Sequence, residues 1–154
     1  MIKKSKRKID YIIVHCTATK EGNEVSVDEI RSWHKQRGWS DIGYHYVVCL
    51  NGEVNDGRDV DISGAHARNY NSNSVGVVYV GGLDKSGKAK DTRTEAQKEG
   101  LLELLKELRK LYPDAKIMGH YDTSPDKNGN GVVDSWEKIK ECPCFNAKEE
   151  YKDI

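Results

Sequence analysis

The stretch that decides the fold is Ile9-Asp10-Tyr11-Ile12-Ile13-Val14, which runs directly into His15. A short apolar run rich in β-branched residues is typical of a strand buried in a sheet. The run Ala115-Lys116-Ile117-Met118-Gly119 repeats this pattern and leads into His120. Each histidine is therefore expected at the carboxyl end of a buried strand, held rigidly at the edge of a cleft. Spacing alone does not separate metal-binding histidines from histidines that satisfy buried hydrogen bonds.

Helix and strand patterns alternate outward from these two runs. Capping boxes at Ser26-Val27-Asp28-Glu29 and Thr94-Glu95-Ala96-Gln97 predict the starts of two helices. The first helix is expected to end at Gly38 and the second, which carries a stripe of leucines, at Tyr112-Pro113.

Two further strands are expected over residues 44–50 and 75–80, the first turned by Asn51-Gly52 and the second broken by Gly81-Gly82. A short helix is expected within residues 146–152. The alternation predicts an α/β fold with a single mixed central β-sheet flanked by helices.

Length and charge exclude several classes of partner. A chain of 154 residues is expected to form one domain, with a basic N-terminal tail over residues 1–8 and the folded domain over residues 9–154. The 25 Lys and Arg residues balance the 25 Asp and Glu residues, which argues against attraction to nucleic acid or to a membrane surface. No stretch of the sequence is a transmembrane candidate, so membrane insertion is not expected. The tail Lys3-Lys4-Ser5-Lys6-Arg7-Lys8 is expected to be solvated and mobile.

No secretory signal is recognisable, so we expect synthesis in the cytoplasm and cysteines that are free thiols or metal ligands. We expect a monomer.

A thiol-rich segment, Lys140-Glu141-Cys142-Pro143-Cys144-Phe145, follows His120. Two histidines and one thiolate from three segments leave a fourth position open around a tetrahedral zinc, as in catalytic sites. Spacing does not choose between Cys142 and Cys144.

Because neighbouring strand residues face opposite sides, a metal-facing His15 makes Cys16 a core thiol. If the strand expected over residues 44–50 is regular at its start, the same alternation places Tyr44 and Tyr46 on one face and His45 on the other.

Several motifs occur in order between residues 9 and 145. They are Val14-His15-Cys16-Thr17-Ala18-Thr19-Lys20, Glu29-Ile30-Arg31-Ser32-Trp33-His34-Lys35, Gly38-Trp39-Ser40-Asp41-Ile42-Gly43-Tyr44-His45, Gly57-Arg58-Asp59, Gly64-Ala65-His66-Ala67, Tyr70-Asn71-Ser72-Asn73-Ser74-Val75-Gly76-Val77 and Cys142-Pro143-Cys144-Phe145. Together they resemble the zinc N-acetylmuramoyl-L-alanine amidases, most of all the bacteriophage amidase-lysozymes, which share a fold with peptidoglycan recognition proteins.

The resemblance implies a peptidoglycan hydrolase that acts on the bacterial cell wall with Zn²⁺ held by His15, His120 and Cys142. It also places Tyr44 and Lys140 at the reaction centre, and His66 in contact with either the substrate or a metal ligand. The alternative for His66 is a histidine of a surface loop without such a role. Zinc bound in this way lowers the pKa of a water toward about 7, and that water is the expected nucleophile on the muramoyl–alanine amide. Lys140 would stabilise the charge on the carbonyl oxygen. Tyr44 would either donate a hydrogen bond to that oxygen or help to move a proton to the leaving amine.

An insertion over residues 126–137 departs from the short phage enzymes. It matches the calcium-loop pattern D-x-[DN]-x-[DN]-G-x₅-E at every specified position. The expected Ca²⁺ ligands are Asp126, Asn128, Asn130, Val132 through its carbonyl, Asp134 and Glu137. The alternative is a turn rich in Asn and Gly without an ion, because Ser124-Pro125 lets no helix enter the loop.

Two other functions compete with the hydrolase. One is a peptidoglycan-binding module without catalysis, against which the retained Cys142, Tyr44 and Lys140 argue. The other is a regulator of an intracellular polymerase or of another intracellular protein, which would contact its partner through the basic N-terminal segment. Only the resemblance to phage lysozymes supports this alternative.

Overall fold

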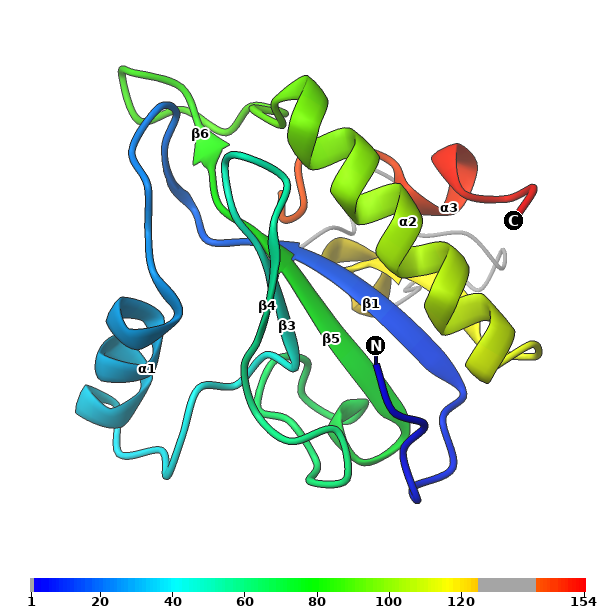
Figure 1. Ribbon diagram of the computed structural model, residues 1–154. Helices are drawn as coiled ribbons and strands as arrows, with labels where there is room; N and C mark the ends of the chain where they lie inside the picture. The colour runs from blue at the N-terminus through cyan, green and yellow to red at the C-terminus, as the bar shows by residue number, and fades with distance from the viewer. Residues whose placement is uncertain (1, 125–140) are drawn as a thin grey trace.

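The computed structural model describes residues 2–124 and 141–154 (Figure 1). Within them, five strands form one central sheet in the order β4-β3-β5-β1-β7. Their bounds are Tyr11–Cys16 for β1, Tyr46–Val48 for β3, Val54–Asp56 for β4, Ser74–Tyr79 for β5 and Lys116–Gly119 for β7. β1 pairs in parallel with β5 and β7, β3 pairs in parallel with β5, and β4 runs antiparallel to β3. The predicted mixed central sheet is confirmed.

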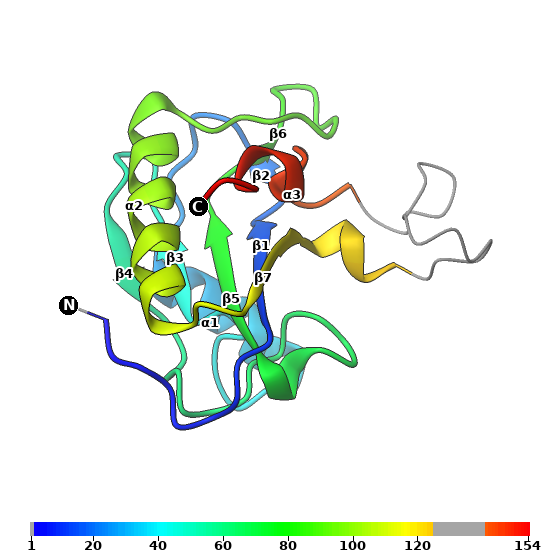
Figure 2. The ribbon, with the colours of Figure 1, turned by 90° about the vertical axis from the view of Figure 1, so that its right-hand side faces the viewer.

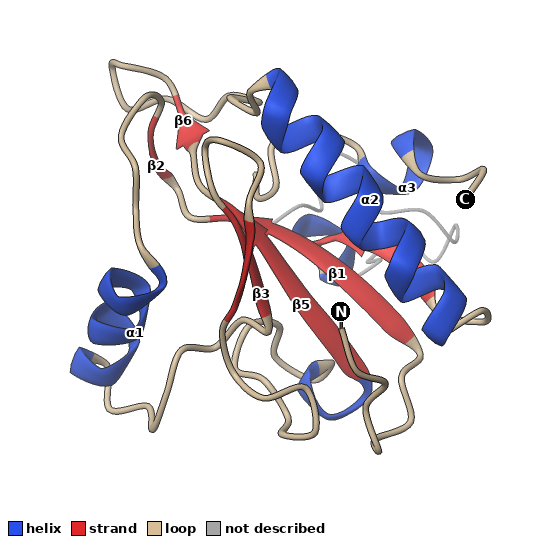
Figure 3. Cartoon of the chain, in the orientation of Figure 1, coloured by secondary structure: helices blue, strands red, loops and turns tan. Residues whose placement is uncertain are grey.

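Helices cover this sheet, as the cartoon in Figure 3 shows. They are α1 (Val27–Gln36), α2 (Glu95–Leu111) and α3 (Ala147–Glu150), with short 3-10 helices η1 (Asn71–Asn73) and η2 (His120–Thr123). A separate pair of short strands, β2 (Thr19–Lys20) and β6 (Gly82–Leu83), lies beyond the ends of β1 and β5. α3 lies against β7 (Figure 2). No helix among the described residues is long and apolar enough to span a bilayer.

Both predicted capping sites start the helices. The hydroxyl of Ser26 accepts the backbone N–H of Glu29 at 3.1 Å. Thr94 and Gln97 form the full reciprocal box, each side chain accepting the other residue's backbone N–H at 3.0 Å. These bonds satisfy donors that the first helical turn leaves without a partner. α1 and α2 therefore begin where the sequence predicts.

The two faces of the sheet carry different layers. Ile12, Val14 and Cys16 point toward α2 and pack with its leucines, and Cys16 is a buried core thiol as predicted. Ile30 of α1 packs on the opposite face with Val47 of β3, Val78 of β5 and the following Val80. Because side chains alternate along β1, His15 lies on the face opposite to α2.

The expectation for Tyr44 and Tyr46 does not hold, because β3 begins only at Tyr46. Tyr46 lies in the core under α2, whereas the ring of Tyr44 lies 5.1 Å from that of His15 on the other face. The regular alternation on which the prediction depended does not extend to Tyr44.

The N-terminal segment is not a solvated tail. Ser5 is buried, its backbone N–H donates to the Tyr112 hydroxyl at 2.7 Å, and its own hydroxyl donates to the Val60 carbonyl at 2.8 Å. The four lysines of this segment, Lys3, Lys4, Lys6 and Lys8, are exposed. Residues 2–8 therefore pack against the domain, and the predicted division at residue 9 does not mark the start of ordered contacts.

Candidate metal centre

The two strand-end histidines and one cysteine meet at one edge of the sheet. One ligand atom each from His15, His120 and Cys142 lies within 4.8 Å of the others, and no other such group is found in the described parts of the chain. β1 and β7 are parallel neighbours, so their carboxyl ends lie at the same edge. His15 lies near the end of β1 and His120 directly follows β7, with ring centroids 4.4 Å apart. Parallel pairing thus joins residues that are far apart in sequence.

The structure distinguishes the two thiols that spacing left open. Cys142 Sγ accepts the backbone N–H of Cys16 at 3.1 Å, which is a suitable contact for a thiolate. Cys144 Sγ instead lies 4.0 Å from Cys16 Sγ and 3.3 Å from the carbonyl oxygen of Gly82. The hydrogen bond with the Cys16 thiol, followed by burial, raises the pKa of Cys144. Cys142 is therefore the thiol placed for a metal, and Cys144 is a protonated neighbour.

His66 lies behind His15. Its Nδ1 is 2.8 Å from His15 Nε2, and its Nε2 is 3.0 Å from the hydroxyl of Ser74. Burial lowers the pKa of His66 well below its ordinary value, so the ring is neutral. When His15 Nε2–H donates to His66 Nδ1, Nδ1 of His15 is the nitrogen that can bind a metal. His66 is thus placed to orient His15, which is one of the two roles that the resemblance implied for it.

Tyr44 borders the same centre. Burial, and then the nearby Cys142 and Cys16, raises the pKa of Tyr44, so its hydroxyl stays protonated at neutral pH and can donate a hydrogen bond. His34 Nδ1 accepts the N–H of Gly43 at 2.8 Å and so fixes the backbone next to Tyr44. Burial lowers the pKa of His34 to about 4, which keeps this nitrogen available as an acceptor.

Arg58 fixes the other side of Tyr44. Its backbone N–H donates to the Tyr44 carbonyl at 2.8 Å, and its guanidinium donates to the carbonyls of Asp41, Ile42 and Ser63. A guanidinium can bind several carbonyls at once because its donors form a planar fork. The motif around Gly57 contained Arg58, but nothing in the sequence indicated this contact.

An open groove of about 810 Å³ leads to the centre. The residues that line it include His34, Trp39, Tyr44, His66, Arg68, Asn71 and His120. Arg37 also lines it, and no carboxylate does so among the described residues. The groove is thus suited to a neutral or anionic ligand. Lys140 and the predicted calcium loop over residues 126–137 lie outside the described residues.

The similarity to known proteins agrees with this geometry. Residues 5–144 match the sequence model of the N-acetylmuramoyl-L-alanine amidases. The chain belongs to this family. The endolysin of Klebsiella phage KP32 is 44% identical to this amidase over 137 residues, which is 89% of the chain and 82% of the relative.

Solved structures show the same fold. The N-acetylmuramoyl-L-alanine amidase LysC from Clostridium intestinale URNW superposes with a TM-score of 0.69 at 24% identity, over 97% of this chain and 89% of that one. The ectodomain complex of peptidoglycan recognition proteins LCa and LCx bound to tracheal cytotoxin gives 0.67 at 26% identity, over 93% and 80%. The predicted family, fold and amidase activity on peptidoglycan are confirmed. The family is generally zinc-dependent.

Proposed function

We propose that this amidase binds zinc through His15, His120 and Cys142 and cleaves the amide between N-acetylmuramic acid and L-alanine during lysis of a bacterial cell wall. The observation that carries the proposal is the convergence of the three ligand atoms within 4.8 Å. Two imidazoles and a thiolate are a donor set that zinc prefers, and three protein ligands leave one position for water. The hydrogen bonds from His15 to His66 and from Cys16 to Cys142 orient two of these ligands.

When bound there, zinc would supply the means to activate water for attack on the amide carbonyl. The protonated hydroxyl of Tyr44 then donates a hydrogen bond to the carbonyl oxygen, on which negative charge grows. The alternative for Tyr44 is transfer of its proton to the leaving amine. Lys140, proposed from the sequence alone, would stabilise the same oxygen with its ammonium group.

The groove supports a peptide-bearing substrate. Arg37 and Arg68 line it without a facing carboxylate among the described residues, so it suits the carboxylates of a stem peptide. His66 also borders the groove, and we retain contact with the substrate as part of its proposed role. The complex of the LCa and LCx ectodomains with tracheal cytotoxin, and the relatives named endolysins, support muropeptides as ligands and the bacterial wall as the place of action. We expect the protein to act as a monomer.

The test is digestion of purified cell wall with product identification by mass. Peptides that begin with L-alanine should be released, a chelator should abolish the release, and zinc should restore it. Cys142→Ser should lower zinc affinity and activity together, and Cys144→Ser is the matched control that should retain both. The proposal of Cys142 as ligand is wrong if only Cys144→Ser loses zinc.

A further inference from the structure

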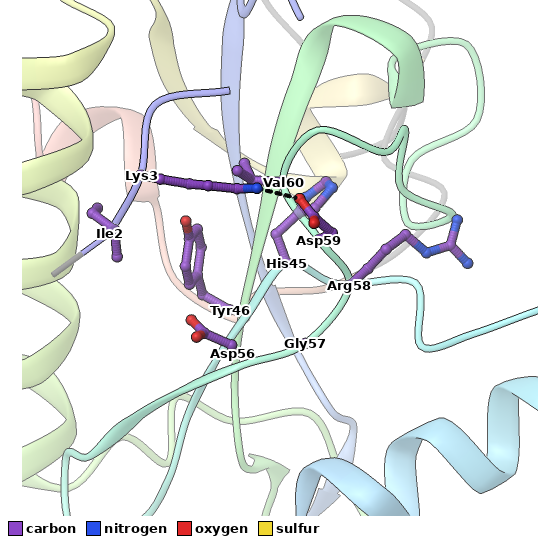
Figure 4. A pocket seen from close by; sticks show the side chains of 9 residues that line it. All are labelled: Ile2, Lys3, His45, Tyr46, Asp56, Gly57, Arg58, Asp59 and Val60. Atoms are coloured by element: carbon purple, nitrogen blue, oxygen red, sulfur yellow. Dashed lines mark ion pairs between the residues drawn. The ribbon is translucent and has the colours of Figure 1, made fainter. Parts of the chain in front are cut away.

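The N-terminal segment contacts the loop that carries His66. This loop runs from the end of β4 to the start of β5, and η1 is its one helical turn. Lys3 forms ion pairs with Asp59 at 3.0 Å, as Figure 4 shows, and with Asp61 at 3.1 Å. Ser5 donates to the carbonyl of Val60. The segment therefore follows the first part of the loop closely.

Arg7 joins the two ends of the same loop. Its guanidinium donates only to backbone carbonyls among the described residues, with donor–acceptor distances of 3.0–3.2 Å. The four acceptors are the carbonyl oxygens of Val60, Asn71, Ser72 and Ser74. Val60 lies near the beginning of the loop, and Ser74 is the first residue of β5. A single side chain thus closes a loop that has little regular structure of its own.

Two of the residues that Arg7 binds are those that fix His66. The side-chain oxygen of Asn71 accepts the backbone N–H groups of His66 and Ala67, both at 2.9 Å. The hydroxyl of Ser74 is 3.0 Å from the Nε2 of His66. Arg7 therefore holds the backbone of Asn71 and Ser74, the side chains of these two residues hold His66, and His66 Nδ1 lies 2.8 Å from His15.

The neighbouring His45 is not part of this chain. Its Nδ1 accepts the backbone N–H of Gly76 at 3.0 Å, so its Nε2 carries the proton and donates to the carbonyl of Ile62 at 2.9 Å. Arg7 lies 3.4 Å from that same Nε2. Both groups are donors, and this contact is therefore not a hydrogen bond. The hydrogen bonds that the Arg7 side chain forms with the described residues are therefore those to the four loop carbonyls.

We propose that Arg7 is a positioning residue of the metal centre, which acts by holding the loop that places His66 against His15. The inference rests on the proposed binding of zinc by His15. It gives the basic segment a role inside the domain in place of a role as an arm for a partner. Lysine cannot replace arginine here, because a single ammonium group cannot reach four separate carbonyls in a fixed plane.

The experiment measures the zinc affinity of the metal-free protein by competition with a chromogenic chelator. Arg7→Lys should weaken zinc binding roughly tenfold, the lower end of the effect of losing a partner that orients a metal ligand. Lys3→Met is the matched control, because it lies in the same segment but contacts neither Asn71 nor Ser74. It should change the affinity less than about twofold. Urea unfolding establishes that each variant is folded under the assay conditions, and Arg7→Gln replaces Arg7→Lys should the latter not fold.

A double variant tests the route. If Arg7 acts through Ser74 and His66, the effects of Arg7→Lys and Ser74→Ala on zinc affinity should be less than additive. Unchanged affinity of Arg7→Lys, full additivity, or equal weakening by Lys3→Met would each overturn the inference while zinc binding by the parent protein still stands. A parent protein that binds no zinc would instead refute the proposed function on which the inference rests.

Discussion

Gly76→Ala tests whether the ring of His66 holds His15 in place. A Cβ at position 76 would lie 2.7 Å from Cδ2 and Cγ of His66 and 2.9 Å from its Nδ1. Ordinary van der Waals contact begins at 3.4 Å, so the ring must move by about 0.7 Å. The ring is held at both nitrogens, at 2.8 Å by His15 and at 3.0 Å by Ser74. A shift of this size along the bond would lengthen the contact with His15 to about 3.5 Å, the limit of a useful hydrogen bond.

The cost has two parts. Insertion of a methyl group into a packed site destabilises a protein by about 1–3 kcal/mol. Loss of the bond that orients a metal ligand weakens metal binding roughly 10- to 100-fold. Gly76→Ala should therefore be less stable in urea unfolding of the metal-free protein, and its zinc affinity should fall by at least about tenfold.

Gly87→Ala is the matched control. Gly87 has φ +89° and no atom within 4 Å of a Cβ, so alanine there costs only backbone strain, roughly 1–2 kcal/mol. It should lose comparable stability while its zinc affinity stays unchanged. If Gly76→Ala binds zinc as tightly as the parent protein, the contact of His66 with His15 does not position the ligand, and the reasoning is refuted.

Three further predictions concern the chemistry, the pH dependence and the predicted calcium loop. Tyr44→Phe should lower kcat about 100-fold in muropeptide digestion while zinc affinity is retained, and a proportional loss of zinc would contradict its role at the carbonyl oxygen. Burial lowers the pKa of His45 to about 4 from 6.5, so the unfolded chain takes up the proton first and stability present above pH 6.5 is lost as the pH falls toward 4. Between pH 7 and pH 5, the free energy of unfolding in urea should fall less for His45→Gln than for the parent protein, by up to about 1.4 kcal/mol per pH unit. Equal losses of stability in the two proteins would exclude His45 as the origin of the pH dependence. Calcium should raise the Tm of the zinc-loaded protein but not that of Asp126→Ala, and a titration without heat or a Tm change would remove the proposed calcium loop.

Local sequence patterns predicted much of the fold because the spacing of apolar residues within a short stretch indicates which side chains face the core. The β-branched run before His15 forms β1, and the box at Thr94 starts α2. The same reasoning failed for Tyr44, since alternation holds only inside a regular strand and β3 starts two residues later. It also failed for the basic segment, because charge density does not show whether carbonyl acceptors such as that of Val60 are within reach of Arg7.

The sequence by itself determined the strands, the helix starts, the family motifs and the kinds of donor atoms that a metal centre would use. Only the tertiary structure decided how those donors meet. Parallel pairing of β1 with β7 brings His15 and His120 to one edge, and a slip of one residue would turn either ring to the opposite face. The family resemblance already implied Cys142, but its contact with Cys16, like the place of His66 behind His15, joins segments far apart in the chain. Such contacts depend on strand register and loop closure, which no short stretch of sequence encodes.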